Sequence, residues 1–104
     1  MKEVYGMYNR MMETFVEHEY ENDFYDVDMF CNDLCKNMFK ETDPQDIETD
    51  DYLVFQQALL LLVRDDMMLH YFGLAGLSVI YADMLDYGKR YYIYNEIYNE
   101  IFNN

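Results

Sequence analysis

The sequence predicts an all-α protein, a compact bundle of about four to five helices with a buried central apolar helix. Its 104 residues are close to the commonest size of one domain, so we expect a single domain over residues 1–104. One proline and four glycines leave few chain breaks, which favours helices over a sandwich or barrel. Twelve Tyr, seven Phe and nine Met supply enough apolar material for a core, despite the high charge.

The first helix is predicted over residues 2 to about 19. Its apolar side chains recur at helical spacing, and Glu13 and Glu17 fall on the opposite side. Residues 21–25 form a plausible turn. The apolar face of this helix consists of Val4, Tyr8, Met11 and Phe15.

A second helix is predicted from an N-cap at Asp26 to about Phe39. A loop follows over residues 41–46, because Pro44 prevents a helix from continuing. The apolar stripe of the second helix is Val27, Phe30, Cys31, Leu34 and Met38.

The third helix is expected to be the central one, because residues 53–63 are apolar nearly all round. Thr49 or Asp50 can cap it, and residues 64–66 mark a break or a new cap. A fourth helix follows, with a bend expected at Gly73 and Gly76 and an end at Gly88, which suits a C′ position.

The longest apolar run, residues 67–82, is shorter than the roughly 20 residues of a membrane-spanning helix, so we predict core and no membrane segment. His70, within this run, is predicted to be a hydrogen-bonded core histidine. The chain then repeats Tyr-Asn-Glu-Ile, which places its apolar side chains on one helical face that suits either the core or a homodimer. The candidate self-association residues are Ile93, Tyr94, Ile97, Tyr98, Ile101 and Phe102.

Charge is the most informative feature of the sequence. The net charge is −14, and residues 1–51 hold fifteen acids and four bases, whereas residues 52–104 hold six acids and three bases. We therefore expect an acidic display half (1–51) and a core-forming half (52–104). Free nucleic acid and anionic membranes are excluded as direct partners, and a basic, nucleic-acid-binding protein is favoured. For any single acidic run, the alternative interpretation is a solvated face that only keeps the protein soluble.

The candidate partner-binding residues come from two stretches without a base, residues 13–33 and 41–51. Fourteen charges correspond to about 24 Å of duplex DNA, at about one charge per 1.7 Å. Tyrosines within the acidic run are added because tyrosine is a favoured interface anchor. The set is Glu13, Glu17, Glu19, Glu21, Asp23, Asp26, Asp28, Asp33, Asp43, Asp46, Glu48, Asp50, Asp51, Tyr20 and Tyr25.

The sequence contains no nucleophile elbow, phosphate loop or dinucleotide-binding turn, so we expect neither an enzyme nor a cofactor. Cys31 and Cys35 are predicted to be buried small hydrophobes, with a metal site shared with His18 or His70 as the alternative. Residues 46–51 lack the glycine and the closing glutamate of a calcium loop, so no metal is expected. Two cysteines and no signal peptide indicate the cytoplasm.

In style, the segment from Tyr8-Asn9-Arg10-Met11-Met12-Glu13 through Tyr25-Asp26-Val27-Asp28-Met29-Phe30 resembles the overcome-classical-restriction proteins of T7-like phages. It combines a helix, an acid-aromatic turn and a second, acid-capped helix, and covers about the first 40 residues. Small acidic anti-CRISPR proteins are similar in character. The resemblance implies a monomeric or dimeric decoy in the host cytoplasm that occupies the DNA groove of a restriction enzyme or CRISPR nuclease.

The leading hypothesis is therefore a phage or mobile-element inhibitor that acts by DNA mimicry. A helical adaptor or assembly protein that acts through its amphipathic C-terminal helix is the first alternative, and an acidic antitoxin is the second.

Overall fold

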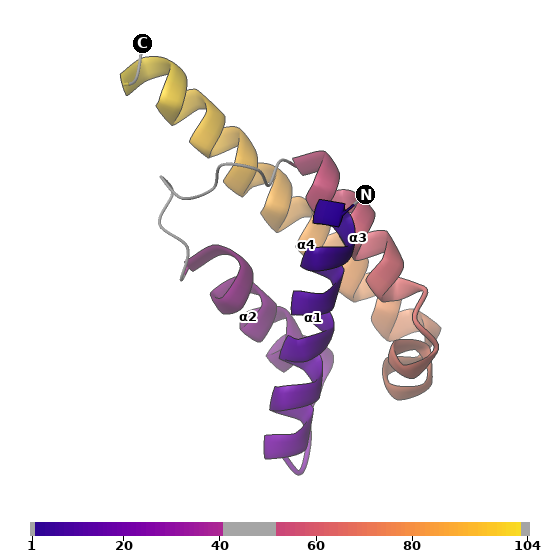
Figure 1. Ribbon diagram of the computed structural model, residues 1–104. Coiled ribbons are helices and arrows are strands. Elements are labelled where there is room, and N and C mark those ends of the chain that lie inside the picture. Colours follow the sequence, from indigo (N-terminus) through magenta and orange to yellow (C-terminus); the bar gives the residue numbers. More distant parts are fainter. Residues whose placement is uncertain (1, 41–51, 103–104) are drawn as a thin grey trace.

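The computed structural model describes residues 2–40 and 52–102, and every regular element within these ranges is helical. α3 packs against both α1 and α4, and the C-terminal end of α4 projects beyond the other helices (Figure 1). The predicted all-α bundle of four to five helices is confirmed. In chain order its elements are α1 (Lys2–Glu21), α2 (Val27–Cys35), the π-helical turn η1 (Lys36–Lys40), α3 (Tyr52–Val63) and α4 (Asp66–Phe102).

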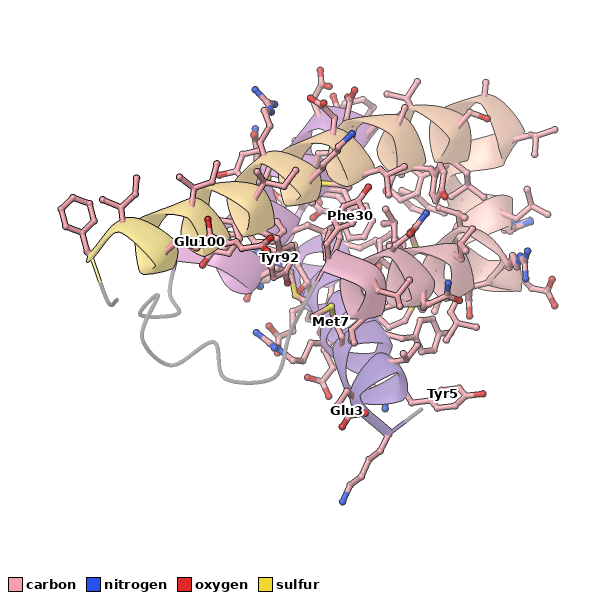
Figure 2. All side chains as sticks on the ribbon, turned by 90° about the horizontal axis from the view of Figure 1, so that it is seen from above. Glu3, Tyr5, Met7, Phe30, Tyr92 and Glu100 are labelled. Carbon is pink, nitrogen blue, oxygen red and sulfur yellow. The ribbon has the colours of Figure 1, made fainter. Side chains whose placement is uncertain are left out.

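α1 follows its predicted amphipathic pattern. Val4, Met11 and Phe15 are buried, and Glu13 and Glu17 are exposed on the other side. Figure 2 shows the same division, with Met7 inside the bundle and Tyr5 pointing outward. The helical period of apolar residues therefore sets which face of α1 meets the core.

α2 begins where the sequence predicts. The Oδ1 atom of Asp26 accepts a hydrogen bond from the Met29 backbone N–H at 2.9 Å, which satisfies one of the unpaired donors at the helix start. η1 continues α2 without a break, and Phe30, Leu34 and Met38 are buried along the predicted stripe.

α3 is the central apolar helix, with Phe55, Leu59 and Leu62 fully buried. Its neighbours α1 and α4 cover two sides of it, and Leu53 in its first turn remains 61% exposed. A sequence that is apolar all round does not reveal which side has no neighbour.

Aromatic rings fill two regions of the core. In the first, Phe15 meets the edge of Phe30 at a centroid distance of 5.6 Å, and Phe30 stacks on Phe72 at 5.5 Å. In the second, Phe55 packs against Phe39 at 5.3 Å and against Tyr92 at 5.9 Å. Helices from both halves of the chain contribute to each region, so the acidic half also helps to build the core.

The break between α3 and α4 is capped by Asp65. Its Oδ1 accepts from the backbone N–H groups of Met67 at 2.9 Å and Met68 at 3.3 Å. The Tyr8 hydroxyl donates to Asp65 Oδ2 at 2.8 Å, which ties the start of α4 to α1. Residues 64–66 thus form the cap that the sequence predicts.

The bend in α4 lies at one of the two predicted glycines. Gly73 has φ 75° and ψ 170°, a conformation that only glycine adopts readily. Gly76 is helical, and a Cβ there would lie 3.3 Å from Val27 Cγ2, so this glycine allows α2 to approach.

The prediction that the fourth helix ends at Gly88 is wrong, because α4 continues to Phe102. Among the described residues only Gly73 has positive φ, so Gly88 is not a C′ glycine. Gly88 is buried where α4 crosses α3, and a Cβ at this position would lie 2.7 Å from Phe55 Cδ1. The glycine permits a close helix crossing.

His70 also departs from its prediction, because it is exposed. Met68 points into the core, and a residue two positions further along a helix is turned by about 200° and faces outward. The run that contains His70 is apolar on both sides, so its composition concealed this orientation.

Candidate partner-binding surface

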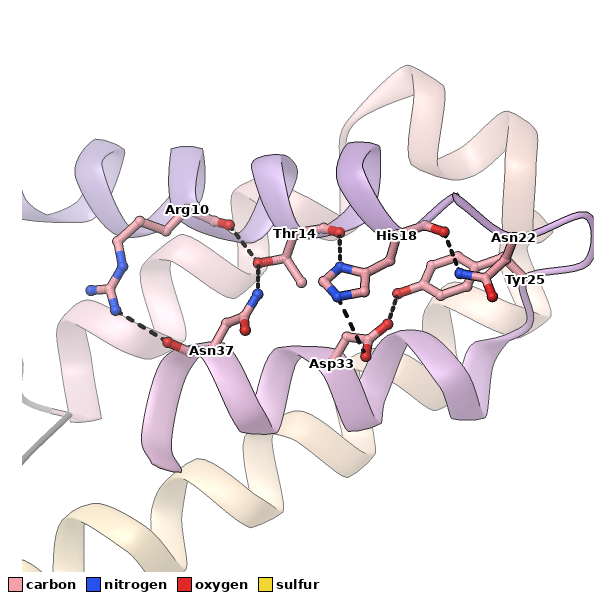
Figure 3. A network of polar contacts seen from close by, with 7 residues as sticks. All are labelled: Arg10, Thr14, His18, Asn22, Tyr25, Asp33 and Asn37. Carbon is pink, nitrogen blue, oxygen red and sulfur yellow. Dashed lines mark hydrogen bonds and ion pairs between the residues drawn. The ribbon is translucent and has the colours of Figure 1, made fainter. Parts of the chain in front are cut away.

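α1 and α2 form a helical hairpin whose end carries most of the described acids; residues 13–33 are called the acidic hairpin here. Its two helices are joined by a row of polar contacts along one edge (Figure 3). The buried Thr14 hydroxyl donates to the Arg10 carbonyl oxygen at 2.8 Å and accepts from Asn37 Nδ2 at 3.0 Å. Arg10 Nη2 donates to the Asn37 carbonyl oxygen at 3.4 Å, so α1 is fastened to η1.

Nearer the turn, three side chains converge between α1 and α2. The Tyr25 hydroxyl donates to Asp33 Oδ2 at 2.6 Å, and His18 Nε2 lies 3.8 Å from Asp33 Oδ1. His18 Nδ1 lies 2.8 Å from the Thr14 carbonyl oxygen, and because a carbonyl only accepts, Nδ1 carries the proton. The rings of His18 and Tyr25 are nearly parallel, with centroids 6.5 Å apart.

Tyr25 is 3% exposed, so the prediction that it faces a partner is wrong. Burial, followed by the hydrogen bond to Asp33, raises its pKa far above the ordinary 10.0. Tyr25 is a structural residue of the hairpin, because its ring fills the core beside Phe15 and Phe30.

The acidic hairpin displays most of its predicted acids. No side chain among these exposed acids forms an ion pair with another described residue. Residues 11–35 contain no Lys or Arg, so the nearest cations along the chain lie outside the hairpin. The exposed acids are Glu13, Glu17, Glu21, Asp23 and Asp28.

Three further acids of the hairpin are only partly available to a partner. Asp26 caps α2, and Asp33 accepts from Tyr25 with its side chain only 17% exposed. Glu19 is half-buried. The sequence prediction treated all eight hairpin acids alike, whereas the structure assigns two of them to holding the hairpin together.

The second acidic stretch lies outside the described residues. This applies to five predicted partner-binding residues and to the predicted helix caps Thr49 and Asp50. The five are Asp43, Asp46, Glu48, Asp50 and Asp51.

Tyr20 is the most exposed tyrosine of the hairpin, at 88%, and it belongs to a row of outward apolar side chains that the sequence analysis missed. Val16 is 48% exposed and Met12 is half-buried, one and two turns before Tyr20. The signal was present in the sequence, since Met12, Val16 and Tyr20 recur every four residues beside Glu13 and Glu17.

The predicted self-association residues lie at the projecting end of α4. Ile93, Ile97 and Ile101 are all exposed, Ile101 at 65%, and Phe102 is exposed as well. Tyr94 and Tyr98 belong to α4, but their side chains lie outside what the structure describes. Of the two roles expected for this face, the core role is wrong for the described isoleucines.

The cysteines lie between α2 and α4 as free thiols, and both are half-buried. Cys35 Sγ lies 4.0 Å from Met84 Sδ. Burial, followed by the nearby Asp83, raises the pKa of the Cys31 thiol to about 12. Within the part of the chain that the structure describes, no group of three or more His, Cys, Asp or Glu side chains is arranged to hold a metal ion.

One described stretch, Asp66–Ile93 of α4, is long and apolar enough to cross a membrane by length and composition, with a mean hydropathy of 1.3. A core helix passes the same test, and Leu77, Ile80 and Met84 of this stretch are buried in the bundle, although only 22% of its apolar window is buried. This is weak support for a membrane segment.

Comparison of the chain with protein-family models, with curated proteins and with solved structures finds no match, so the proposals below rest on the residues of this chain.

Proposed function

We propose that the protein is a non-enzymatic inhibitor that presents its acidic hairpin to the basic nucleic-acid-binding groove of a partner protein. The observation that carries the proposal is a group of exposed carboxylates in a stretch without any Lys or Arg, none of which forms an ion pair with another described residue: Glu13, Glu17, Glu21, Asp23 and Asp28. Ordinary surface helices gain stability from pairs of opposite charge one turn apart, and this hairpin forgoes them. Its resemblance to anti-restriction and anti-CRISPR proteins directs the proposal to a restriction enzyme or CRISPR nuclease.

The spacing of the carboxylates supports electrostatic mimicry. Glu13, Glu17 and Glu21 follow one another at about 6 Å along α1, and Asp23 and Asp28 add charge at the turn and the start of α2. One DNA strand places a phosphate every 3.4 Å or so, so the ridge on α1 alone is sparser than a strand. The exposed acids of the turn and of α2 are therefore needed in the binding surface as well.

The test is capture of partners from a bacterial lysate on the immobilised protein, with elution by a short DNA duplex and identification by mass spectrometry. We expect a DNA-binding nuclease to be released by duplex and by salt. Raising the ionic strength from about 0.05 to about 0.3 M shortens the screening length from about 14 to about 6 Å. Capture that survives high salt and ignores added duplex would contradict mimicry.

Two matched variants test whether position matters as well as total charge. The triple variant Glu13→Gln, Glu17→Gln, Glu21→Gln should weaken partner binding by about tenfold or more. A control removes three charges from α4 instead: Asp83→Asn, Asp86→Asn, Glu96→Gln. If both variants lose the same affinity, net charge is sufficient and the hairpin is not the site.

The exposed isoleucines of α4 favour a second candidate, self-association in a helical assembly. The chain is strongly acidic, but residues 89–102 hold two bases, Lys89 and Arg90, and two acids, Glu96 and Glu100. Two copies can therefore approach along this face with little repulsion. Light scattering should show a concentration-dependent dimer that Ile97→Asp with Ile101→Asp abolishes, whereas the hairpin triple variant leaves it intact. A strictly monomeric parent protein would exclude this candidate.

A further inference from the structure

A groove of about 560 Å³ lies on the outer side of α1, beside the first turn of α4. It combines apolar and acidic groups. Its lining residues are Asn9, Met12, Glu13, Val16, Glu17 and Met67.

The apolar part of the groove is held in a defined position. Met12 and Val16 follow one another by one turn of α1, and Met67 faces them from α4. Met67 is fixed there by Asp65, which accepts from the Met67 backbone N–H and from the Tyr8 hydroxyl of α1. Two of the three apolar side chains remain accessible, since Val16 is 48% and Met67 47% exposed.

The acidic part lies along the same turns of α1. Glu13 and Glu17 are exposed, stand about 6 Å apart along the helix, and form no ion pair within the described part of the chain. Tyr20, one turn beyond Val16, extends the apolar row and is almost fully exposed.

We infer that this groove binds an amphipathic basic segment of the partner, with an apolar side chain seated among Met12, Val16 and Met67 and Lys or Arg side chains paired with Glu13 and Glu17. Charge complementarity selects this occupant, because the acidic rim repels nucleic acid, acidic peptides and a second copy of the hairpin. Phosphate mimicry alone gives no reason for an apolar floor. Methionine side chains adapt to different apolar groups, which suits a groove that receives a helix.

The inference rests on the proposed function and adds a specificity element to it. Charge gives attraction that salt screens, whereas burial of an apolar side chain is not weakened by screening. The two contributions can therefore be separated by measuring binding at two ionic strengths.

The test uses two synthetic peptides of about 18 residues, long enough for a helix to form on binding. One alternates Lys and Leu at helical spacing, and the other has Ser in place of every Leu and the same charge. Fluorescence anisotropy titrations at about 0.3 M salt should show that the Leu peptide binds at least about tenfold more tightly than the Ser peptide. Equal affinities would overturn the inference.

Substitutions that add a negative charge separate the groove from simple charge attraction. Val16→Asp and, independently, Met67→Asp should remove the preference for the Leu peptide, although attraction by charge alone predicts unchanged or tighter binding. Met67→Asp protects the test against misfolding, because Asp is favoured in the first turn of a helix. Val79→Asp on α4 and Ile97→Asp at the projecting end are controls outside the groove, and both should retain the preference.

The result also distinguishes failure of the inference from failure of the proposed function. If Glu13→Gln with Glu17→Gln weakens both peptides and Val16→Asp changes nothing, the acidic surface stands and the groove has no apolar role. If Ile97→Asp alone removes the preference, the Leu peptide binds at the end of α4 and the groove is not the site. If neither peptide binds at about 0.05 M salt, the proposed attraction to basic partners fails as well.

Discussion

Replacing Gly88 with alanine tests how closely α3 and α4 approach each other. The new Cβ would lie 2.7 Å from Cδ1 and 3.1 Å from Cζ of Phe55. Phe55 is fully buried, and its ring is enclosed by Phe39 and Tyr92 at centroid distances of 5.3 and 5.9 Å. Relief of this clash therefore requires the Phe55 ring and the rings beside it, or the two helices themselves, to shift.

The expected loss combines two opposing effects. Inserting a methyl group into a packed core costs about 1–3 kcal/mol, while alanine in place of glycine within a helix gains about 1 kcal/mol. We expect Gly88→Ala to lower the free energy of unfolding by up to about 2 kcal/mol. For a domain of this size that corresponds to a fall in Tm of up to about 16 °C.

Gly6→Ala is the matched control, since a Cβ at Gly6 meets no atom within 4 Å. This variant should keep the helix gain of up to about 1 kcal/mol, so the difference between the two variants isolates the steric effect. Urea titrations followed by circular dichroism measure both. Phe55→Leu should cost less stability in the Gly88→Ala background than in the parent, because it removes the opposing ring edge. A Gly88→Ala variant as stable as Gly6→Ala would refute the close crossing.

Gly73→Ala should lower the free energy of unfolding by about 1–3 kcal/mol through backbone strain, because φ at this position is 75°. A Cβ there meets no atom within 4 Å, so steric overlap does not contribute. Thermal unfolding measures the loss, and a neutral result would mean that α4 is not broken at Gly73. The free energy of unfolding should also fall as pH rises above about 10, because the unfolded chain ionises its tyrosines near the ordinary pKa of 10.0, whereas folding raises the pKa of Tyr25 through burial and its bond to Asp33. Tyr25→Phe should cost about 1–2 kcal/mol near pH 8 and show a weaker decline with pH; urea midpoints at about pH 8 and about pH 11 check both, and an equally steep decline would contradict the assignment. Finally, in a Cys35→Ala background at about pH 8, Cys31 should react with iodoacetamide at least about a hundredfold more slowly in the native protein than in urea. The reason is that only the thiolate reacts, and folding raises the pKa of the Cys31 thiol to about 12. Similar rates in the two conditions would show that the thiol is ionised in the native protein.

The structure divides the acids of the hairpin into two groups with different uses. Asp26 and Asp33 accept hydrogen bonds from other groups of the hairpin, so these two carboxylates stabilise the fold. Glu13 and Glu17 have no such donors in the described chain, and they border an apolar groove. The candidate surface is thus smaller than the acidic run in the sequence, and it offers a partner both charge and apolar contact.

Features that depend on neighbours within one or two helical turns follow directly from the amino-acid sequence. The buried face of α1 follows from apolar residues at helical spacing, and the Asp26 cap needs only the backbone N–H three residues later. The absence of bases between residues 11 and 35 is likewise a property of composition, so an acidic hairpin was predictable.

Which side of each helix meets another helix depends on how the helices pack together in three dimensions. In the sequence Tyr25 is one of two tyrosines within an acidic run, and nothing there indicates burial. In the structure the packing of α1 against α2 buries it and places Asp33 within hydrogen-bonding distance. The sequence predicts a helix end at Gly88, whereas in the structure this glycine contacts the Phe55 ring of α3. Periodicity identifies the buried face of a helix only when one face is apolar. For a helix that is apolar on several sides, such as α3 or α4, the buried side is the one that neighbouring helices cover.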